Sequence, residues 1–328
     1  MKSSTYQPRP SRLLWLTAIA SSVLLIGFVM SLVDWQTAKQ VVAAANRPLA
    51  FMGVLLLGLE GFITALRFRL LAVGPTAYSL CLQATAWYVL LLLALPARLG
   101  EVAGVGTMVK YMGQNAGASA VNLFLQRIFD VLTLGAMFCL ISFQYLTGDQ
   151  LGVALISALL IMSALVAIIV YLPACMRIVA GAVFPYRDNR FANRLMKLAL
   201  QARLSIKLNL DINTSLKLAL LTIIKWLVIL SAITCIVLAI EPALEVITGL
   251  GIGIAYNLAA VIPLQTIGGA GIAEMALLGS FKWLGYTAAT GATLAIAIRI
   301  ALLVGPIAFG AVLLLYFQVA RPIKMDAT

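Results

Sequence analysis

The sequence predicts an all-α, polytopic membrane protein with about eight transmembrane segments, built as an inverted-topology repeat with two broken or re-entrant hairpins. Of the 328 residues, 63% are hydrophobic and 10% are charged, whereas a soluble domain is roughly 45–50% apolar and about 25% charged. The apolar residues form runs of the roughly 20-residue length that crosses a bilayer as a helix. Residues 1–328 form a single transmembrane domain with approximate halves 13–146 and 151–317, and each half contains one of two similar proline- and glycine-rich breaks.

Four apolar runs make up the first half. The run 13–33 resembles a signal peptide, but it is too long for one, and the small residues Ala43 and Ala45 lie too far past its end, so we expect a retained first span. The second span covers 49–70. The third covers 78–95 and stops at Pro96, because proline ends a helix. The fourth lies near 118–146.

The second half follows the same order. A fifth span covers 151–172, a sixth covers 218–240, and a run at 246–262 stops at Pro263. The last span covers 288–317. The tryptophans mostly lie near the ends of these runs, where anchoring at the membrane interface explains them: Trp15, Trp35, Trp87, Trp226 and Trp283.

Residues 173–217 form a basic segment within the second half. It carries a net charge of +6, half of the +12 of the whole chain. Five of its basic residues recur at helical spacings and predict an amphipathic helix on an anionic membrane surface: Arg190, Arg194, Lys197, Arg203 and Lys207. Basic loops stay in the cytoplasm, so we expect this loop and both termini on the cytoplasmic side of a bacterial-type inner membrane. The charge therefore indicates orientation and lipid contact, not nucleic-acid binding.

The two breaks are alike. Their marking residues are Pro96, Gly100, Pro263, Gly268, Gly269 and Gly271. A glutamate follows in each break, and a lone arginine comes in the next span. Arg127 lies 26 residues after Glu101, and Arg299 lies 25 residues after Glu274. With both ends cytoplasmic, the first hairpin opens to the cytoplasm and the second opens outward.

Inverted repeats with a broken helix in each half are typical of secondary transporters, whose substrate site lies near the bilayer midplane at the repeat interface. The alternative is a duplicated fold in which the glycines only let helices pack closely, without transport. Hairpins that open to opposite sides favour transport, because alternating access needs them and a scaffold does not.

Several kinds of chemistry are excluded. The sequence has no histidine, which excludes His-based hydrolase, phosphatase and metalloprotease mechanisms. The four cysteines are far apart and form no CxxC pair, so they are interpreted as small buried hydrophobes. We expect no catalytic residue, no metal and no cofactor.

Ionisable residues at membrane depth are the candidate site. They are Glu60, Arg98, Glu101, Arg127, Asp130, Glu274 and Arg299. Each costs roughly 2.5–3.5 kcal/mol at a helix centre, so each needs a partner or a wet cavity. All of them except Glu60 are predicted to bind substrate, because guanidinium groups suit a phosphate diester, and carboxylates suit an ammonium, hydroxyl groups or a coupling proton.

Two of these pairs have local spacing. Arg98 with Glu101, and Arg127 with Asp130, lie i to i+3 on one helical face, so either they neutralise each other and fix the bundle, or they line the site. The acid and the arginine of the second half have no local partner, which favours a polar cavity shared by both breaks.

Three motifs and one residue of the last span carry a family resemblance. The motifs are Pro96-Ala-Arg-Leu-Gly-Glu101, Gln126-Arg127-Ile-Phe-Asp130 and, after Pro263, Gly268-Gly269-Ala-Gly271-Ile-Ala-Glu274, followed by Arg299. Together they resemble the transmembrane, flippase-like domain of the lysylphosphatidylglycerol synthase/flippase family, over nearly the whole chain. This sequence has Gly104, Gln126 and Ala273 where charged residues are common in the family, so the headgroup stays open.

The resemblance implies a lipid translocase. Family members move aminoacylated phospholipids in the best-known branch, and other branches are linked to cardiolipin, hopanoids or polyprenyl-linked glycans. The best-known branch also carries a soluble aminoacyltransferase domain after the last span. This chain ends at Thr328, so synthase activity is not expected.

The predicted function is movement of a phosphate-bearing lipid across the cytoplasmic membrane: an aminoacyl-phospholipid, another phospholipid or a polyprenyl-linked lipid. Its partners are membrane lipids, and no nucleic acid is expected. One alternative is an intramembrane lipid-modifying transferase with Asp130 or Glu101 as base, although the sequence lacks a nucleophile motif and a metal-binding acidic cluster. The other alternative is a scaffold that recruits a lipid-synthesis enzyme through the basic loop.

Overall fold

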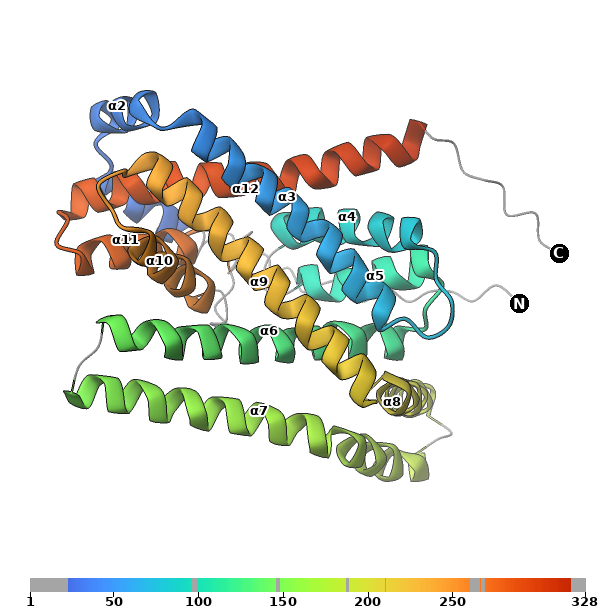
Figure 1. Cartoon of the computed structure of the whole chain (residues 1–328). Coiled ribbons are helices and arrows are strands. Elements are labelled where there is room, and N and C mark those ends of the chain that lie inside the picture. The colour runs from blue at the N-terminus through green and yellow to red at the C-terminus, as the bar shows by residue number, and fades with distance from the viewer. Residues whose placement is uncertain are drawn as a thin grey trace.

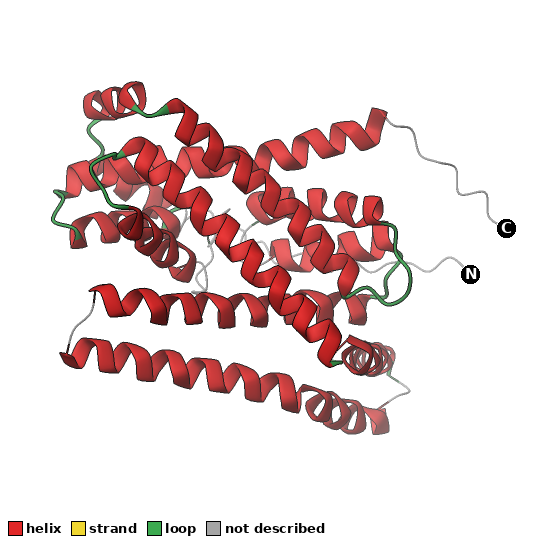
Figure 2. Ribbon diagram, viewed as in Figure 1, coloured by secondary structure: helices red, strands yellow, loops and turns green. Residues whose placement is uncertain are grey.

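The computed structural model describes residues 23–95, 99–145, 148–186, 189–209, 211–259, 266 and 269–319. Within these ranges all regular secondary structure is helical (Figure 2). An apolar helix at Val23–Leu32 is followed by α2 (Trp35–Ala44), α3 (Arg47–Leu70), α4 (Tyr78–Ala94), α5 (Leu99–Met112), α6 (Ala116–Tyr145), α7 (Gly148–Val183), the short 3₁₀-helix η1 (Phe184–Tyr186), α8 (Arg190–Asn209), α9 (Ile212–Ile240), α10 (Val246–Ala259), α11 (Ile272–Trp283) and α12 (Ala288–Val319). Among the described helices, α3, α6, α9 and α12 are long and apolar enough to cross a membrane. The predicted polytopic, all-α fold is confirmed.

The same order of elements occurs twice. A long helix, two shorter helices and a second long helix form α3, α4, α5 and α6, and again α9, α10, α11 and α12 (Figure 1). Helices α7 and α8 lie between the two sets in the chain. The four predicted runs 49–70, 78–95, 118–146 and 288–317 correspond to α3, α4, α6 and α12 within a few residues.

The first long helices of the two sets, α3 and α9, lie side by side and run in opposite directions (Figure 1). At one end the backbone N–H of Asn46, which caps α3, donates to the carbonyl of Ala239 near the end of α9, at 2.8 Å. Further along, Gly53 packs so closely on α9 that an added Cβ would lie 2.8 Å from the carbonyl oxygen of Ala232. Corresponding helices therefore run antiparallel, as an inverted repeat requires.

The glycines of the first break serve helix packing. The sequence predicts that their density weakens the helix after Pro96, yet α5 is helical from Leu99. An added Cβ at Gly100 would lie 2.6 Å from Cα of Leu92 on α4, and one at Gly104 would lie 2.6 Å from the ring of Tyr88. These positions let α4 and α5 approach more closely than any side chain would allow, and the packing outweighs the low helix propensity of glycine.

Two predicted boundaries were wrong. The fifth span does not stop at residue 172, because α7 continues to Val183; beyond Pro173 the chain stays apolar apart from one arginine, so nothing else interrupts the helix. Helix α9 begins six residues before the predicted 218, because the carboxylate of Asp211 caps its first turn and accepts from the N–H of Thr214 at 3.3 Å.

The predicted amphipathic helix of the basic segment is α8. It buries Ala199, Ala202 and Ile206, and the last two pack against α6 and the end of α3. Lys197, Arg203 and Lys207 are exposed, whereas the side chains of Arg190 and Arg194 lie outside the described residues.

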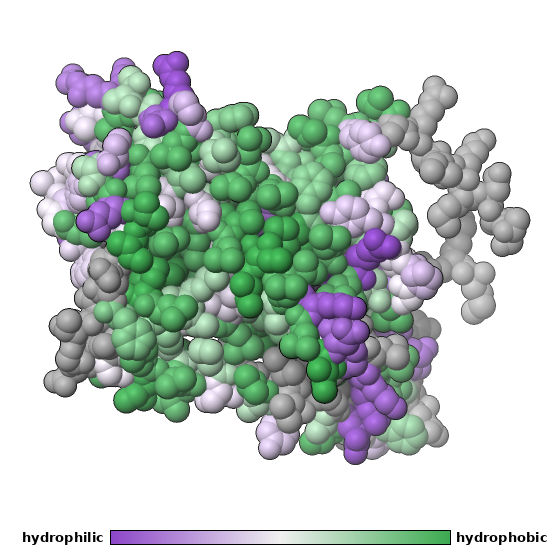
Figure 3. Space-filling model, viewed as in Figure 1, coloured by the Kyte–Doolittle hydropathy of each residue, from purple (hydrophilic) through white to green (hydrophobic). Residues whose placement is uncertain are grey.

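The surface has an apolar middle and polar ends. Figure 3 shows a broad hydrophobic area over α3 and α9, with hydrophilic clusters near α2 and near α8. Large apolar side chains such as Leu59 on α3 and Leu220 and Leu227 on α9 are exposed on the outside of the bundle. Such an extensive apolar surface fits contact with lipid.

Candidate functional site: a charged cavity between the two halves

A cavity of about 490 Å³ lies where the two sets of helices meet. Its polar lining comes from both sets: Glu60, Thr64, Arg67, Tyr88, Glu101, Gln126, Arg127, Asp130, Lys225, Trp226, Tyr256, Asn257, Thr266 and Arg299. The remaining lining is mostly apolar. Residues of both breaks line it, with Glu101 from the first and Gly269 from the second, and it lies between the long apolar helices.

In the first half, three helices bring together a tyrosine, a glutamate and an arginine. Nε of Arg127 on α6 lies 3.2 Å from Oε1 of Glu101 on α5, and its NH2 group donates to the hydroxyl of Tyr88 on α4 at 2.9 Å. The side chains of Arg127 and Glu101 are 42% and 29% exposed. Because both line the cavity, this exposure lets a ligand reach the pair.

The second half repeats this group. Nε of Arg299 on α12 lies 3.2 Å from Oε1 of Glu274 on α11, and NH1 of Arg299 donates to the hydroxyl of Tyr256 on α10. Here the side chains are only 8% and 6% exposed. Glu274 also accepts from the backbone N–H of Gly271 at 2.5 Å, and Gly271 adopts a φ of 91° that suits glycine. The second group is therefore closed where the first is open.

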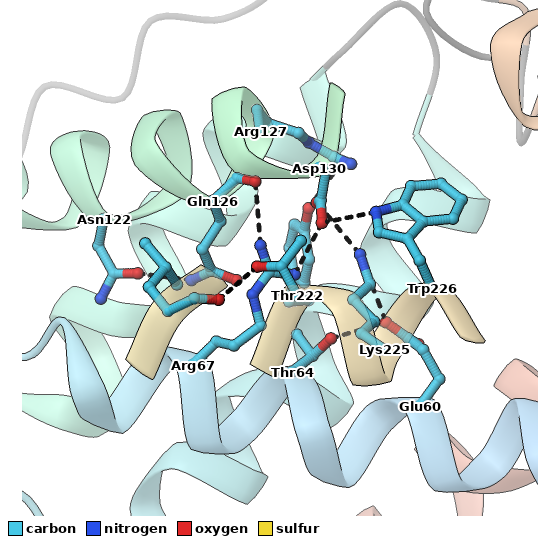
Figure 4. A network of polar contacts seen from close by, with 12 residues as sticks. Glu60, Thr64, Arg67, Asn122, Gln126, Arg127, Asp130, Thr222, Lys225 and Trp226 are labelled. Atoms are coloured by element: carbon cyan, nitrogen blue, oxygen red, sulfur yellow. Dashed lines mark hydrogen bonds and ion pairs between the residues drawn. The ribbon is translucent and has the colours of Figure 1, made fainter. Parts of the chain in front are cut away.

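A third cluster surrounds Asp130 on α6 (Figure 4). Its carboxylate lies 3.0 Å from NH1 of Arg67 on α3 and 3.1 Å from Nζ of Lys225 on α9. The indole N–H of Trp226 donates to it at 3.2 Å. All four side chains are buried, so Asp130 ties three helices together and belongs to both halves.

The cluster extends to Glu60 on α3. Its Oε1 lies 3.8 Å from Nζ of Lys225 and accepts from the hydroxyl of Thr64 at 2.7 Å (Figure 4). Arg67 also donates through NH2 to the backbone carbonyl of Gln126 at 3.0 Å. Every charge in the cluster thus has an opposite charge or a hydrogen-bond partner within reach, as membrane depth demands.

The charges of the three groups balance. Four carboxylates meet four cations: Glu60, Glu101, Asp130 and Glu274 with Arg67, Arg127, Lys225 and Arg299. A charged ligand that enters the cavity must therefore open an existing pair. The most exposed pair, Arg127 with Glu101, is the easiest to open.

The structure corrects three predictions about the site. Arg127 does not pair with its i+3 neighbour Asp130. Arg127 pairs with Glu101 instead, and Asp130 pairs with Arg67 of α3 and Lys225 of α9. Glu274 does not line the cavity itself, because it lies behind Arg299, which does. Trp226 is a buried partner of Asp130 and not an interface anchor.

The other predicted positions fall into two groups. Pro96, Arg98, Pro263 and Gly268 lie outside the described residues. Gly269 and Gly271 have positive φ values of 71° and 91°, so the second break is not helical there.

Four site residues were missed from the sequence. Arg67 lies near the end of its apolar run, where cations usually reach the membrane surface, and Lys225 lies in the middle of α9. Only the packing of the helices buries both side chains against Asp130. Tyr88 and Tyr256 lie inside uncharged runs, without a charge to mark them. The signal that could have found them is a tyrosine in the run before each break: Tyr88 lies thirteen residues before Glu101, and Tyr256 lies eighteen residues before Glu274.

Within the described residues, no group of three or more His, Cys, Asp or Glu side chains could hold a metal ion. The cavity instead offers guanidinium and ammonium donors, carboxylate acceptors and tyrosine hydroxyls. Such groups bind charged and hydroxylated headgroups by ion pairs and hydrogen bonds.

Comparison with known proteins gives one match. The profile of the family described as "Lysylphosphatidylglycerol synthase TM region" matches residues 15–310, nearly the whole chain. No curated protein and no solved structure matches. The matched range contains both Tyr–Glu–Arg groups and the Asp130 cluster. The chain therefore belongs to the lysylphosphatidylglycerol synthase transmembrane-region family, which makes it a membrane protein linked to lipid handling.

Proposed function

We propose that this protein translocates a phosphate-bearing lipid across the membrane, with the headgroup passing through the charged cavity. The observation that carries the proposal is the pair of matching Tyr–Glu–Arg groups on one cavity, the first open and the second closed. Alternating access requires such a site at the interface of two inverted halves.

Arg127 is the proposed phosphate-binding residue. Its guanidinium already holds a carboxylate, and a phosphate diester offers the same pair of oxygens at similar geometry. A phosphate that displaces Glu101 leaves that carboxylate free to accept an ammonium, a hydroxyl group or a proton. Where the ligand brings an ammonium or a proton to that carboxylate, binding keeps the cavity neutral, which membrane depth favours.

Each Tyr–Glu–Arg group acts as a gate to the cavity, and the second half supplies the gate that is closed in this structure. Arg299 lines the same cavity but is held by Glu274 and Tyr256 in a buried arrangement. In the alternate state this group opens and the first group closes, so that the headgroup passes from one arginine to the other without leaving a polar environment.

Transport by purified protein in liposomes tests the proposal. Phospholipids with a labelled headgroup are followed across the bilayer, and recovered lipid is analysed for chemical change. We expect movement of unchanged lipid, strongly reduced by Arg127→Ala and unaffected by Lys39→Ala, which removes an exposed cation on α2 far from the cavity. A chemically altered lipid would indicate a transferase instead, and neither movement nor change would support a scaffold.

A further inference from the structure

A second hollow of about 420 Å³ adjoins the charged cavity between α6, α10 and α11. We call it the tail groove and define it by Phe138 and Ile141 on α6, Ala255 and Leu258 on α10, and Gly279 and Trp283 on α11. Within the part of the chain that the structure describes, no charged side chain lines it. It has the size and the apolar lining of a small-molecule site.

The tail groove continues the charged cavity along two helices. On α6, Leu134 lines the cavity, and Phe138 and Ile141 line the groove on the next two turns of the same face. On α11, Ile272 lines the cavity, and Ala276 lines the groove one turn later. Both helices pack on α10, which contributes Ala255 and Leu258 to the groove and Tyr256 and Asn257 to the cavity.

The two serine hydroxyls that line the groove are already hydrogen-bonded. The hydroxyl of Ser142 donates to the carbonyl of Phe138 at 2.8 Å, and that of Ser280 donates to the carbonyl of Ala276 at 2.9 Å. A polar ligand would therefore find little to bind here, whereas a hydrocarbon chain loses nothing by entering. A ligand that fills both hollows must be polar at one end and apolar at the other.

We propose that the tail groove binds an acyl chain of the same lipid whose phosphate-bearing headgroup enters the charged cavity. The identity of the headgroup rests on the function proposed above, but occupancy of the groove does not require transport. A lipid held at both ends is oriented with its phosphate toward Arg127, and its tail stays in an apolar path while the headgroup crosses.

A photoreactive lipid tests this assignment directly. A phospholipid with a diazirine near the end of one acyl chain is incorporated with the full-length protein into nanodiscs, irradiated, and mapped by peptide mass spectrometry. We expect labelling of 138–142 and 276–284 that competes with unlabelled phospholipid. The outer apolar side chains of α7, such as Val153 and Leu160, report ordinary contact with bulk lipid.

Two glycine variants give a matched comparison. Gly279 and Gly106 are both exposed positions inside helices, and an added Cβ meets nothing within 4 Å at either. Gly279 lines the groove, so Gly279→Leu adds a side chain there and labelling of the groove peptides should fall severalfold. Gly106→Leu, on α5 and away from both hollows, should leave it unchanged.

The outcomes separate this inference from the proposed function. Labelling spread evenly over α7 and the groove peptides, or equal in both glycine variants, would overturn the inference even if lipid transport is normal. Groove labelling that only free fatty acid displaces would overturn it as well, because the occupant would then be no phospholipid. Specific labelling without any transport in liposomes would confirm the lipid site and refute the proposed translocation.

Discussion

Glu60 and Lys225 form an ion pair between equivalent positions of the two halves, with Oε1 and Nζ 3.8 Å apart. Each lies thirteen residues after the first residue of its helix, Arg47 of α3 and Ile212 of α9. Because these helices pack side by side and antiparallel, residues at the same distance from the two helix starts lie opposite each other only near the middle of the pair. The repeat thus places an acid and a base at its own centre, so the two halves are alike in backbone order but opposite in charge there.

The first prediction compares how much Lys225 and Glu60 each contribute to stability. Lys225→Met removes a cation that also lies 3.1 Å from Asp130, whereas Glu60→Gln removes a partly exposed acid at the longer distance of 3.8 Å. Loss of one partner from a buried pair costs about 3–5 kcal/mol. We therefore expect Lys225→Met to lower the melting temperature in detergent clearly and Glu60→Gln to change it little.

The charge-reversed double variant checks this explanation. Glu60→Lys with Lys225→Glu restores a pair of opposite charges between α3 and α9, but it places a glutamate beside Asp130. The double variant should therefore be no more stable than Lys225→Met. Full recovery of the melting temperature would show that the Glu60 contact is the one that matters.

The second prediction compares the two arginines of the repeat. Arg127→Ala removes a cation that is 42% exposed in the cavity, and Arg299→Ala removes one that is 8% exposed and buried with Glu274. We expect Arg127→Ala to abolish most lipid transport at near-normal folded yield, measured by size-exclusion chromatography. Arg299→Ala should lower the yield as well, because it leaves Glu274 buried without its cation.

A charge swap shows whether Arg127 and Glu101 form a structural ion pair or a phosphate-binding site. The pair to reverse is Glu101→Arg with Arg127→Glu, since these two side chains are in contact. If the ion pair is purely structural, the swapped protein should recover full transport. A phosphate site would not, because the guanidinium then projects from α5 and no longer donates to Tyr88.

Much of the fold follows from the sequence, because membrane spans depend on run length and composition alone. The runs that became α3, α4, α6 and α12 needed no tertiary information. The pairing inside the cavity did need it. Asp130 has an i+3 arginine, and local spacing favours that partner, but helix packing brings Arg67 and Lys225 closer. The tertiary arrangement of α6 relative to α3 and α9 decides this, and local spacing in the sequence does not contain that arrangement.

The third prediction concerns orientation in the membrane. The basic segments around α8 lie at the opposite end of α9 from Glu241 and Glu245, and the positive-inside rule predicts that α8 lies in the cytoplasm. Reporters fused near Arg190 and after Lys324 should both score cytoplasmic, and one near Asp149 should score external. An external result at Arg190 would contradict the predicted orientation, in which the first hairpin opens to the cytoplasm and the second opens outward.

The last prediction tests whether the two Tyr–Glu–Arg groups exchange their open and closed states. Val131 on α6 lines the charged cavity, so Val131→Cys, in a protein whose four native cysteines are replaced by alanine, reports access from water. Oriented vesicles are treated from either side with an impermeant thiol reagent. If the groups alternate, Glu101→Gln and Glu274→Gln weaken opposite gates, and they should shift the ratio of labelling from the two sides in opposite directions. The exposed Lys39→Cys on α2 is the control, and it should label from one side only in every background. Equal ratios in both glutamine variants, or shifts in the same direction, would mean that the open first group and the closed second group are fixed features of a single state. The cavity would then bind a lipid without passing it across.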